Sequence, residues 1–283
     1  MAVRPPLPYF APEGSLPTPR LPTVAEILAS ETFLVRYGAA PIVRVGDHYV
    51  VKYGRKVSLQ EGENMLFVRQ FTSVPVPTVY ALFHDKETGN NFIIQEYIPG
   101  TMLDLLWDKL SYTEKMRITW QLRQNMEELR RIPSPGYYGG IWEQPAPYYS
   151  FRGLESAFSA AQETEEYWAY GLWRSLDLKL KGNARRILRS RWCKYQAIFK
   201  GHEAVFTHGG LYPGNIMLNE ETGTVVIINW ELSGWYPSFW EYCCAIILLQ
   251  YRRDWALWVP VILDKYVEEL KLVKSHRKLM LKS

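Results

Sequence analysis

The chain has 283 residues, enough for one large domain or for two lobes that each bury a core. A formal net charge of +4 and a charged fraction of 22% are ordinary for a globular protein and do not indicate a nucleic-acid partner. The aromatic fraction of 14% is high, so aromatic side chains are expected to line an oversized core or an apolar ligand pocket.

Residues 1–22 are rich in proline and lack the apolar region of a signal peptide, so they are expected to form an extended arm. The longest apolar run, near residues 243–249, is shorter than the roughly 20 residues of a membrane span. Cys193 and the neighbours Cys243 and Cys244 do not make a disulfide framework. These features predict a cytoplasmic protein with no membrane span.

Residues 23–99 have the pattern of a small lobe that mixes strands and helices. The turn dipeptide Gly46-Asp47 between two β-branched runs indicates a hairpin, and a Pro-Gly break follows the last apolar run. The predicted elements are a helix over 23–33, a hairpin over 41–54, a helix from Ser58, and strands within 73–83 and 91–98.

From residue 100 onward the pattern becomes mostly helical. Ser111 and Glu114 form a capping box, and the apolar residues behind it recur at helical spacing. The predicted buried face of this helix consists of Ile118, Leu122, Met126 and Leu129. Eight basic residues and no acid lie within 179–200, which we interpret as the solvated face of an amphipathic helix. A hairpin over 215–229 and C-terminal helices complete this lobe.

Two segments concentrate aromatic side chains. The loop over 132–150 is rich in proline, glycine and aromatics and has the length of a functional loop. The helix that follows carries Tyr167, Trp168, Tyr170 and Trp173, of which two point away from any single helical face. Such a stripe packs in a core or lines a pocket.

Three pieces with a possible shared role stand in order along the chain. Lys52 ends a hairpin strand, a carboxylate follows on the next helix, and the loop with His208 and Asn215 precedes a hairpin that ends in "IINWE". A lysine held by a glutamate can grip nucleotide phosphates, while loop and strand-end groups carry magnesium and orient an acceptor. The expected partner of Lys52 is Glu61 rather than Glu63.

This order resembles the protein-kinase-like fold and closely the aminoglycoside phosphotransferase family, especially its fungal branch. The phrases that carry the resemblance are "VVKYG", "SVPVPTVY", "EYIPG", "VFTHGGLYPGNIML", "IINWELSGWYP" and "FWEYC". The resemblance implies a two-lobed α+β fold with a small N-terminal lobe at 23–99 and a helical C-terminal lobe at 100–283. It also implies relic nucleotide-binding positions at Lys52, Glu61, Glu96 and Ile98.

The chain departs from the family motif at two positions. The motif is His-Gly-Asp-Leu-x-x-x-Asn followed by Ile-Asp-Trp-Glu, and its two aspartates fall on Gly210 and Asn229. Glycine cannot accept a proton, and the neutral amide of Asn229 is a poor ligand for a hard cation. Glu231 lies two residues beyond Asn229 and would face the same side of an extended strand, so a rescue of metal binding by Glu231 stays open.

The first hypothesis is therefore a kinase-fold protein that has lost phosphoryl transfer and reuses its cleft for an apolar small molecule. Such a pocket would promote a shape-driven cyclisation or cycloaddition in fungal secondary metabolism, as a pericyclase does, with no metal and no cofactor. Its candidate catalytic residues are His208, Gly210, Asn215 and Asn229. Its candidate substrate-binding residues are Trp142, Tyr167, Trp168, Trp173, Trp235 and Tyr236.

Two alternatives remain. One is a residual small-molecule phosphotransferase that uses ATP, and the other is a non-catalytic pseudokinase that acts as a binding module. Lys52 and its partner are either a relic ion pair or a live ligand contact, and the oligomeric state is left open.

Overall fold

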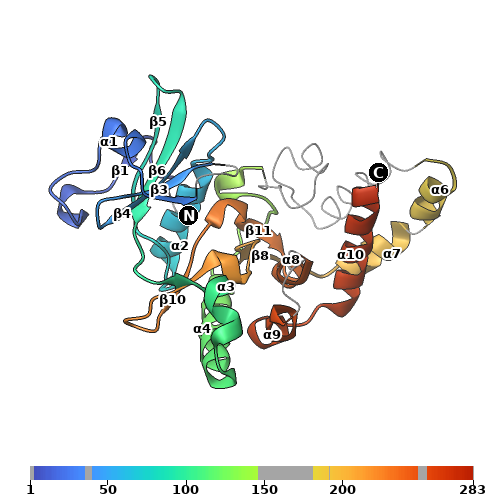
Figure 1. Cartoon of the computed structure of the whole chain (residues 1–283). Coiled ribbons are helices and arrows are strands. Elements are labelled where there is room, and N and C mark those ends of the chain that lie inside the picture. The colour runs from blue at the N-terminus through green and yellow to red at the C-terminus, as the bar shows by residue number, and fades with distance from the viewer. Residues whose placement is uncertain (1–2, 36–39, 146–180, 191, 248–253, 283) are drawn as a thin grey trace. The chain divides into compact units, whose positions relative to one another are not determined.

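The computed structural model describes residues 3–35, 40–145, 181–190, 192–247 and 254–282 (Figure 1). The chain forms two compact units. Unit 1 comprises Met1–Met102 and Met217–Glu231, and unit 2 comprises Leu103–Ile216 and Leu232–Ser283. The change from a mixed to a mostly helical sequence pattern near residue 100 thus lies close to the end of the first segment of unit 1. Most of the hairpin that follows the loop at 208–215 also belongs to unit 1.

A six-stranded antiparallel sheet forms most of unit 1 (Figure 1). Its strands lie in the order β1-β5-β6-β4-β3-β2. They are β1 (Tyr9–Phe10), β2 (Phe33–Val35), β3 (Ile42–Val45), β4 (Tyr49–Gly54), β5 (Val79–Asp85) and β6 (Asn90–Glu96). The hairpin predicted over 41–54 is confirmed, and Gly46 takes a positive φ of 60° at its turn.

The helix predicted over 23–33 is wrong at its C-terminal end. Helix α1 spans only Val24–Leu28, and Phe33 belongs to β2, where it pairs with Val43. A capping box of Thr23 and Glu26 fixes the start of α1. The aromatic and β-branched residues at 33–35 gain more from pairing with β3 than from extending a short helix.

The two faces of this sheet are covered by different parts of unit 1. Phe92, Ile94 and Val51 belong to one core cluster, against which residues of the N-terminal segment and α1 pack. Helix α2 (Gln60–Phe71) packs against β5 on the other side, where Gly62 allows close approach to Leu82. The predicted helix from Ser58 is therefore confirmed, with its first turn at Gln60.

A second, three-stranded sheet completes unit 1, in the order β10-β9-β7. Its strands are β7 (Thr101–Met102), β9 (Ile216–Leu218) and β10 (Val225–Ile227). Gly100 enters this sheet with a φ of 155°, and a side chain there would collide with the carbonyl oxygen of Leu218. The hairpin predicted over 215–229 is confirmed.

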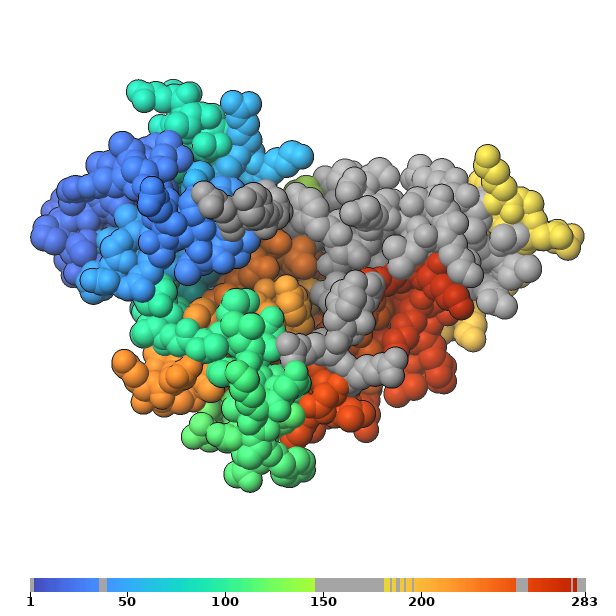
Figure 2. All heavy atoms as spheres, in the orientation of Figure 1, coloured from blue at the N-terminus to red at the C-terminus, as the bar shows by residue number. Residues whose placement is uncertain are grey.

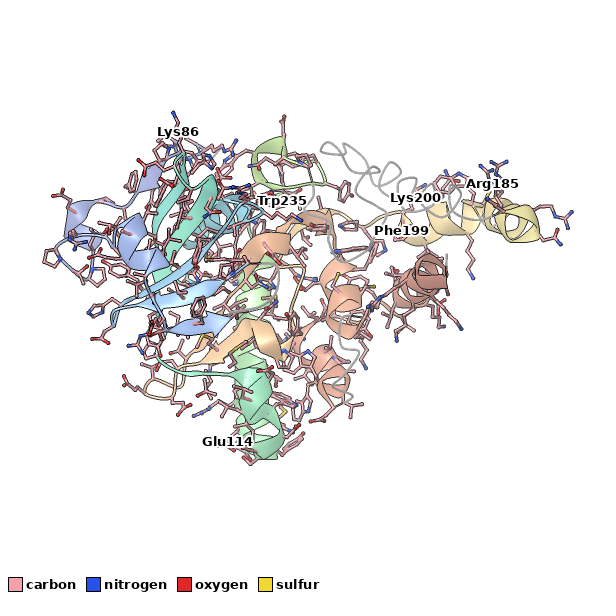
Figure 3. All side chains as sticks on the ribbon, turned by 45° about the horizontal axis from the view of Figure 1, so that its top comes forward. Lys86, Glu114, Arg185, Phe199, Lys200 and Trp235 are labelled. Atoms are coloured by element: carbon pink, nitrogen blue, oxygen red, sulfur yellow. The ribbon has the colours of Figure 1, made fainter. Side chains whose placement is uncertain are left out.

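Unit 2 is mainly helical. Its helices are α3 (Leu103–Leu106), α4 (Tyr112–Arg130), α6 (Gly182–Ser190), α7 (Trp192–Phe199), α8 (Trp240–Ile247), α9 (Trp255–Ile262) and α10 (Val267–Lys282). Strands β8 (Ala204–Thr207) and β11 (Gly234–Pro237) pair antiparallel. The capping box at the start of α4, where Figure 3 labels Glu114, and the predicted buried face of this helix are both confirmed.

The described residues of the basic stretch in 179–200 form α6 and α7, and Figure 3 labels Arg185 on α6 and Lys200 directly after α7. Arg186, Arg189 and Lys194 are exposed, in agreement with a solvated face, and Phe199 is buried. Among the described residues, no helix combines the length and the apolar character that a bilayer crossing requires.

Candidate functional site

Lys52 on β4 is the centre of a cluster of polar side chains in unit 1. Its ammonium donates hydrogen bonds to Glu61 Oε2 at 2.6 Å, to Glu231 Oε2 at 3.0 Å and to Asn229 Oδ1 at 3.3 Å. The structure therefore pairs Lys52 with Glu61, as the sequence predicts. We call these four residues the Lys52 cluster.

The Lys52 cluster carries one formal positive and two formal negative charges. Burial lowers the pKa of the Lys52 ammonium, but the charges of Glu61 and Glu231 outweigh burial and leave that pKa above its ordinary value. Burial raises the pKa of the Glu61 carboxyl, and Lys52 opposes that shift. The Glu231 side chain is 35% exposed, whereas that of Glu61 is 5% exposed, so Glu231 is the carboxylate that solvent or a ligand can reach.

The backbone around Trp230 aims two side chains at Lys52. Asn229 has a φ of 63°, a left-handed conformation that asparagine tolerates better than most residues. The carbonyl of Trp230 accepts a hydrogen bond from Asn64 on α2 at 2.8 Å, and its buried indole donates to the carbonyl of Ile227 at 2.9 Å. Residues 230–232 form a 3-10 turn rather than an extended strand, so Glu231 reaches Lys52 through this turn.

A second constellation lies in unit 2, in the loop at 208–215. Glu241 on α8 accepts hydrogen bonds from the backbone N–H groups of His208, Gly209 and Leu211 at 2.7, 3.0 and 3.3 Å. The side chain of Asn215 donates to the carbonyl of Gly210 at 2.9 Å. The loop is therefore held by side chains that bind its own backbone.

Glu241 belongs to the segment "FWEYC", but its role was not predicted from the sequence. The residue is 2% exposed, and burial raises the pKa of its carboxyl, while the loop N–H groups oppose that shift. A glutamate inside an otherwise apolar helix is a signal for a buried hydrogen-bond acceptor. Its partners, however, lie some 30 residues earlier in the chain and could not be read from the sequence.

Gly210 does not open the space that its small size suggests. A side-chain carbon at this position would lie 3.1 Å from Nδ2 of Asn215 and 3.6 Å from Cε1 of His208. Within unit 2, the first carbon of a side chain at this position would therefore already contact these two neighbours. His208 is fully buried, and its Nδ1 accepts a hydrogen bond from the N–H of Gly210 at 3.2 Å.

Comparison with known proteins identifies the family. The sequence pattern of the phosphotransferase enzyme family matches residues 29–272. The chain belongs to this family. No curated protein sequence matches the chain.

Solved structures similar to this phosphotransferase-family protein share its fold. The streptomycin-ATP-APH(2")-IIa ternary complex has a TM-score of 0.57 at 16% identity, over 90% of this chain and 83% of that chain. The apo form of a thermostable mutant of aminoglycoside phosphotransferase APH(4)-Ia has a TM-score of 0.59 at 11% identity, over 89% and 87%. Choline kinase LicA from Streptococcus pneumoniae has a TM-score of 0.51 at 14% identity, over 89% and 84%. The kinase-like α+β fold expected from the sequence is therefore confirmed.

The remaining predicted nucleotide positions of this phosphotransferase-family protein lie at the end of β6 and just beyond it. Glu96 at the end of β6 accepts hydrogen bonds from the N–H and the hydroxyl of Thr78, at 3.0 and 2.7 Å. Ile98 is 8% exposed and belongs to the core of unit 1. In the structure Glu96 thus stabilises the neighbouring chain segment, and neither residue is part of the Lys52 cluster.

The predicted aromatic pocket is only partly visible. Tyr167, Trp168 and Trp173 lie outside the described residues, as does the end of the loop after residue 145. The other three candidates are described. Trp235 packs on Phe206 with 3% exposure, and Tyr236 is buried against Trp240, so both are core residues rather than walls of an open pocket. Trp142 is half-buried.

Proposed function

We propose that this phosphotransferase-family protein binds a nucleotide with a divalent cation through the Lys52 cluster and has lost ordinary phosphoryl transfer. The observation that supports binding is the intact geometry around Lys52, which contacts Glu61 at 2.6 Å and Glu231 at 3.0 Å. An ammonium held by a glutamate is the recurrent phosphate contact of kinase-like folds.

The residues of the Lys52 cluster fit the nucleotide and its cation in part. Lys52 would contact phosphate oxygens, and Glu231 with Asn229 would hold the cation, because a hard divalent cation prefers oxygen ligands and at least one anionic one. A bound divalent cation supplies positive charge beside the phosphates. Glu231 thus replaces the negative charge that Asn229 lacks, and it is exposed enough to change partners.

The net charge of the Lys52 cluster predicts that nucleotide binding depends on the divalent cation. The Lys52 cluster has a formal charge of −1 when both glutamates are ionised, so free triphosphate approaching Lys52 is repelled by Glu231. A cation removes this repulsion.

The loop at 208–215 supports the loss of transfer. Gly210 offers no proton acceptor at the position where the family carries an aspartate, and such a group contributes about 10² to 10⁴ in rate in enzymes generally. Glu241 touches the loop, but its carboxylate is buried and already accepts three backbone hydrogen bonds. It would have to release the loop before it acted as a base.

Calorimetric titration tests this proposal. ATP is titrated into the wild type, into Lys52→Met and into the control Lys86→Met, each with and without magnesium. Lys86 lies at the tip of the exposed β5–β6 hairpin (Figure 3) and is not part of the cluster. The wild type and Lys86→Met should bind only with magnesium, and Lys52→Met about tenfold or more weakly. Magnesium-dependent binding that is unchanged in Lys52→Met, or no binding by the wild type, overturns the proposal.

A second candidate function is the shape-driven cyclisation of an apolar metabolite, in a cytoplasmic fungal setting. One observation favours a ligand contact at Trp142: this residue and Glu143 have successive positive φ values of 53° and 61°. Two adjacent non-glycine residues in this region store strain, which functional loops often do. The N–H of Glu143 donates to the hydroxyl of Tyr137 at 2.9 Å and holds this conformation.

Fluorescence quenching separates this candidate from a structural loop. An amphipathic probe with a large apolar surface, anilinonaphthalene sulfonate, is titrated into the wild type and into the Trp142→Ala and Trp120→Ala variants, the latter changing an exposed control tryptophan. Loss of saturable binding in Trp142→Ala alone supports a ligand contact. Equal binding of the probe by all three proteins rejects a ligand contact at Trp142.

A further inference from the structure

The N-terminal segment, residues 3–21, wraps around the β5 edge of the sheet in unit 1. Its strand β1 pairs with β5, with Tyr9 opposite Leu82 and Phe10 opposite Ala81, and the N–H of Ala11 donates to the carbonyl of Tyr80 at 2.8 Å. In Figure 2 this dark blue segment lies against the lighter blue residues of the same unit. The segment predicted as an extended arm thus contributes the two-residue strand β1 to the sheet.

The two ends of the N-terminal segment are anchored on different sides of β5. On one side, Arg4 donates to the carboxylate of Glu63 on α2 from Nε at 2.7 Å and from Nη2 at 3.1 Å. On the other side, Leu16 and Leu21 pack against the cluster that contains Ala81 and Phe92. The segment thus crosses the sheet edge between the helix-covered face and the opposite face.

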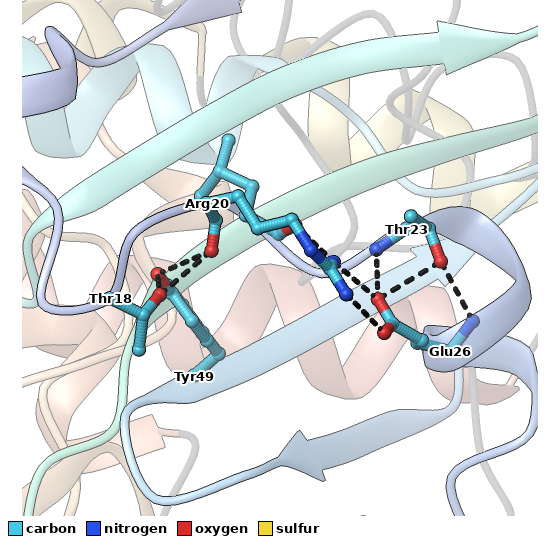
Figure 4. A network of polar contacts seen from close by, with 6 residues as sticks. Thr18, Arg20, Thr23, Glu26 and Tyr49 are labelled. Carbon is cyan, nitrogen blue, oxygen red and sulfur yellow. Dashed lines mark hydrogen bonds and ion pairs between the residues drawn. The ribbon is translucent and has the colours of Figure 1, made fainter.

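The second anchor is a polar network at residues 18–26 (Figure 4). The hydroxyl of Thr18 is hydrogen-bonded to that of Tyr49 on β4. Arg20 makes a two-pronged ion pair with Glu26 on α1, at 2.8 and 2.7 Å. The N-terminal segment is consequently fixed at both ends and paired in its middle.

The first turn of α2 depends on such external contacts. Its N-cap, Leu59, provides no side-chain hydrogen bond, the hydroxyl of Ser58 accepts one long hydrogen bond from the N–H of Gln60 at 3.3 Å, and Gly62 in this turn lowers the intrinsic helix propensity. Glu61 and Glu63 are two residues apart, so their side chains leave the helix about 200° apart. Lys52 binds Glu61 on one side of the helix, and Arg4 binds Glu63 on another.

We propose that Arg4 is a positioning residue: the N-terminal segment acts as a strap that holds the first turn of α2 and thereby keeps Glu61 at Lys52. Glu63 is 1% exposed, and removal of the Arg4 guanidinium takes away a two-pronged partner of a buried carboxylate. The turn then moves toward water to solvate Glu63, and Glu61 moves with it. The contact of Lys52 with Glu61 is weakened without any change in either residue.

Hydrogen exchange tests the strap without reference to nucleotide. Backbone amides of 60–66 are compared in the wild type, Arg4→Met, Arg4→Lys and the control Lys86→Met. Methionine keeps the apolar stem of Arg4 and removes its charge, lysine restores the charge with a single donor group, and Lys86→Met changes an exposed residue at the tip of the β5–β6 hairpin, outside both anchors. Arg4→Met should exchange about tenfold faster in 60–66 but not in β4 and β6, Arg4→Lys should be intermediate, and Lys86→Met should match the wild type.

Glu63→Gln provides the same test from the helix side and should reduce the effect of Arg4→Met when the two are combined. Glu63→Gln also tests the strap on its own if Arg4→Met does not fold. Unchanged exchange in 60–66 for both Arg4→Met and Glu63→Gln overturns the strap, and so does an equal acceleration throughout unit 1.

A nucleotide titration extends the test and rests on the proposed function. Arg4→Met should bind magnesium-ATP about tenfold more weakly than the wild type and Lys86→Met, although Arg4 does not belong to the Lys52 cluster. If the wild type binds no magnesium-ATP but exchange in 60–66 still accelerates in Arg4→Met, the nucleotide proposal fails and the strap stands. If the wild type binds and Arg4→Met binds equally well, the link from strap to Lys52 fails.

Discussion

The two units use a buried glutamate in opposite ways. In the Lys52 cluster, carboxylates hold a side-chain cation, and one of them, Glu231, is partly exposed. In the loop at 208–215, the Glu241 carboxylate holds three backbone N–H groups and is shielded from water. A carboxylate that binds a side-chain ammonium can exchange this partner for a ligand. A carboxylate that binds backbone N–H groups cannot be released without opening the loop that it holds. This difference supports the binding role proposed for the first glutamate set and a structural role for the second.

The largest effect on stability is expected for Glu241→Ala. The change leaves three buried N–H groups without their acceptor, and each such group costs about 1 to 3 kcal/mol. Because a cavity and local relaxation alter the sum, we expect a net loss of about 3 to 5 kcal/mol in the free energy of unfolding. Urea unfolding monitored by tryptophan fluorescence measures this loss. A loss below about 1 kcal/mol contradicts the structural role of Glu241.

The neighbouring glycines of the loop should differ in their tolerance. Gly209 has a φ of 79°, and a side-chain carbon there would lie 2.6 Å from the carbonyl oxygen of Leu232. Gly210 lacks a positive φ, and its nearest contact would be the Asn215 amide at 3.1 Å. Gly209→Ala should therefore lower the free energy of unfolding by about 2 to 4 kcal/mol and Gly210→Ala by about 1 kcal/mol or less. Equal losses of unfolding free energy for the two variants in the same experiment contradict the difference in backbone conformation and contacts between Gly209 and Gly210.

Within the Lys52 cluster, the two glutamates should contribute unequally to stability. Glu61→Gln weakens a buried ion pair and is expected to cost about 1 to 2 kcal/mol, whereas the partly exposed Glu231→Gln is expected to cost less than about 1 kcal/mol. Thermal unfolding of the two variants ranks them. A larger loss for Glu231→Gln indicates that this residue is structural and not free to serve a ligand.

The smallest effect concerns pH and the second anchor of the strap. Hydrogen bonds from Arg20 and Thr23 lower the pKa of the Glu26 carboxyl from 4.5 to about 2. A carboxyl with a lowered pKa stabilises the folded state above pH 4.5, and this contribution is lost as the pH falls from 4.5 toward 2. The stability difference between the wild type and Glu26→Gln should shrink over this range in thermal unfolding. A difference that grows with acidity contradicts the assigned contacts.

Local pattern was sufficient for much of the fold. The hairpin at 41–54 and the capping box of α4 depend on turn and capping chemistry that neighbouring residues encode. The end of α1 was missed because pairing with β3 decides the conformation of 33–35. The pairing of β1 with β5 was missed for the same reason, since the proline-rich pattern of the segment does not reveal its partner.

The candidate site could be predicted only where its partners are close in the chain. Lys52 and Glu61 are nine residues apart, and their pairing follows from a strand and the next helix. Glu231 joins them from 179 residues away through a turn that the expected extended strand did not allow for. The contacts of Glu241 with the loop and of Arg4 with Glu63 likewise require the tertiary structure.

The most direct test of the central claim measures binding and turnover in one sample. Wild-type protein is saturated with magnesium-ATP, as confirmed by calorimetry, and ADP formation is followed with and without hydroxyl acceptors such as choline and kanamycin. We predict bound ATP that stays intact, with ADP formation at the level of a protein-free control, because Gly210 supplies no base. Turnover near the rate of about 1 to 100 per second that is typical of kinases contradicts the account.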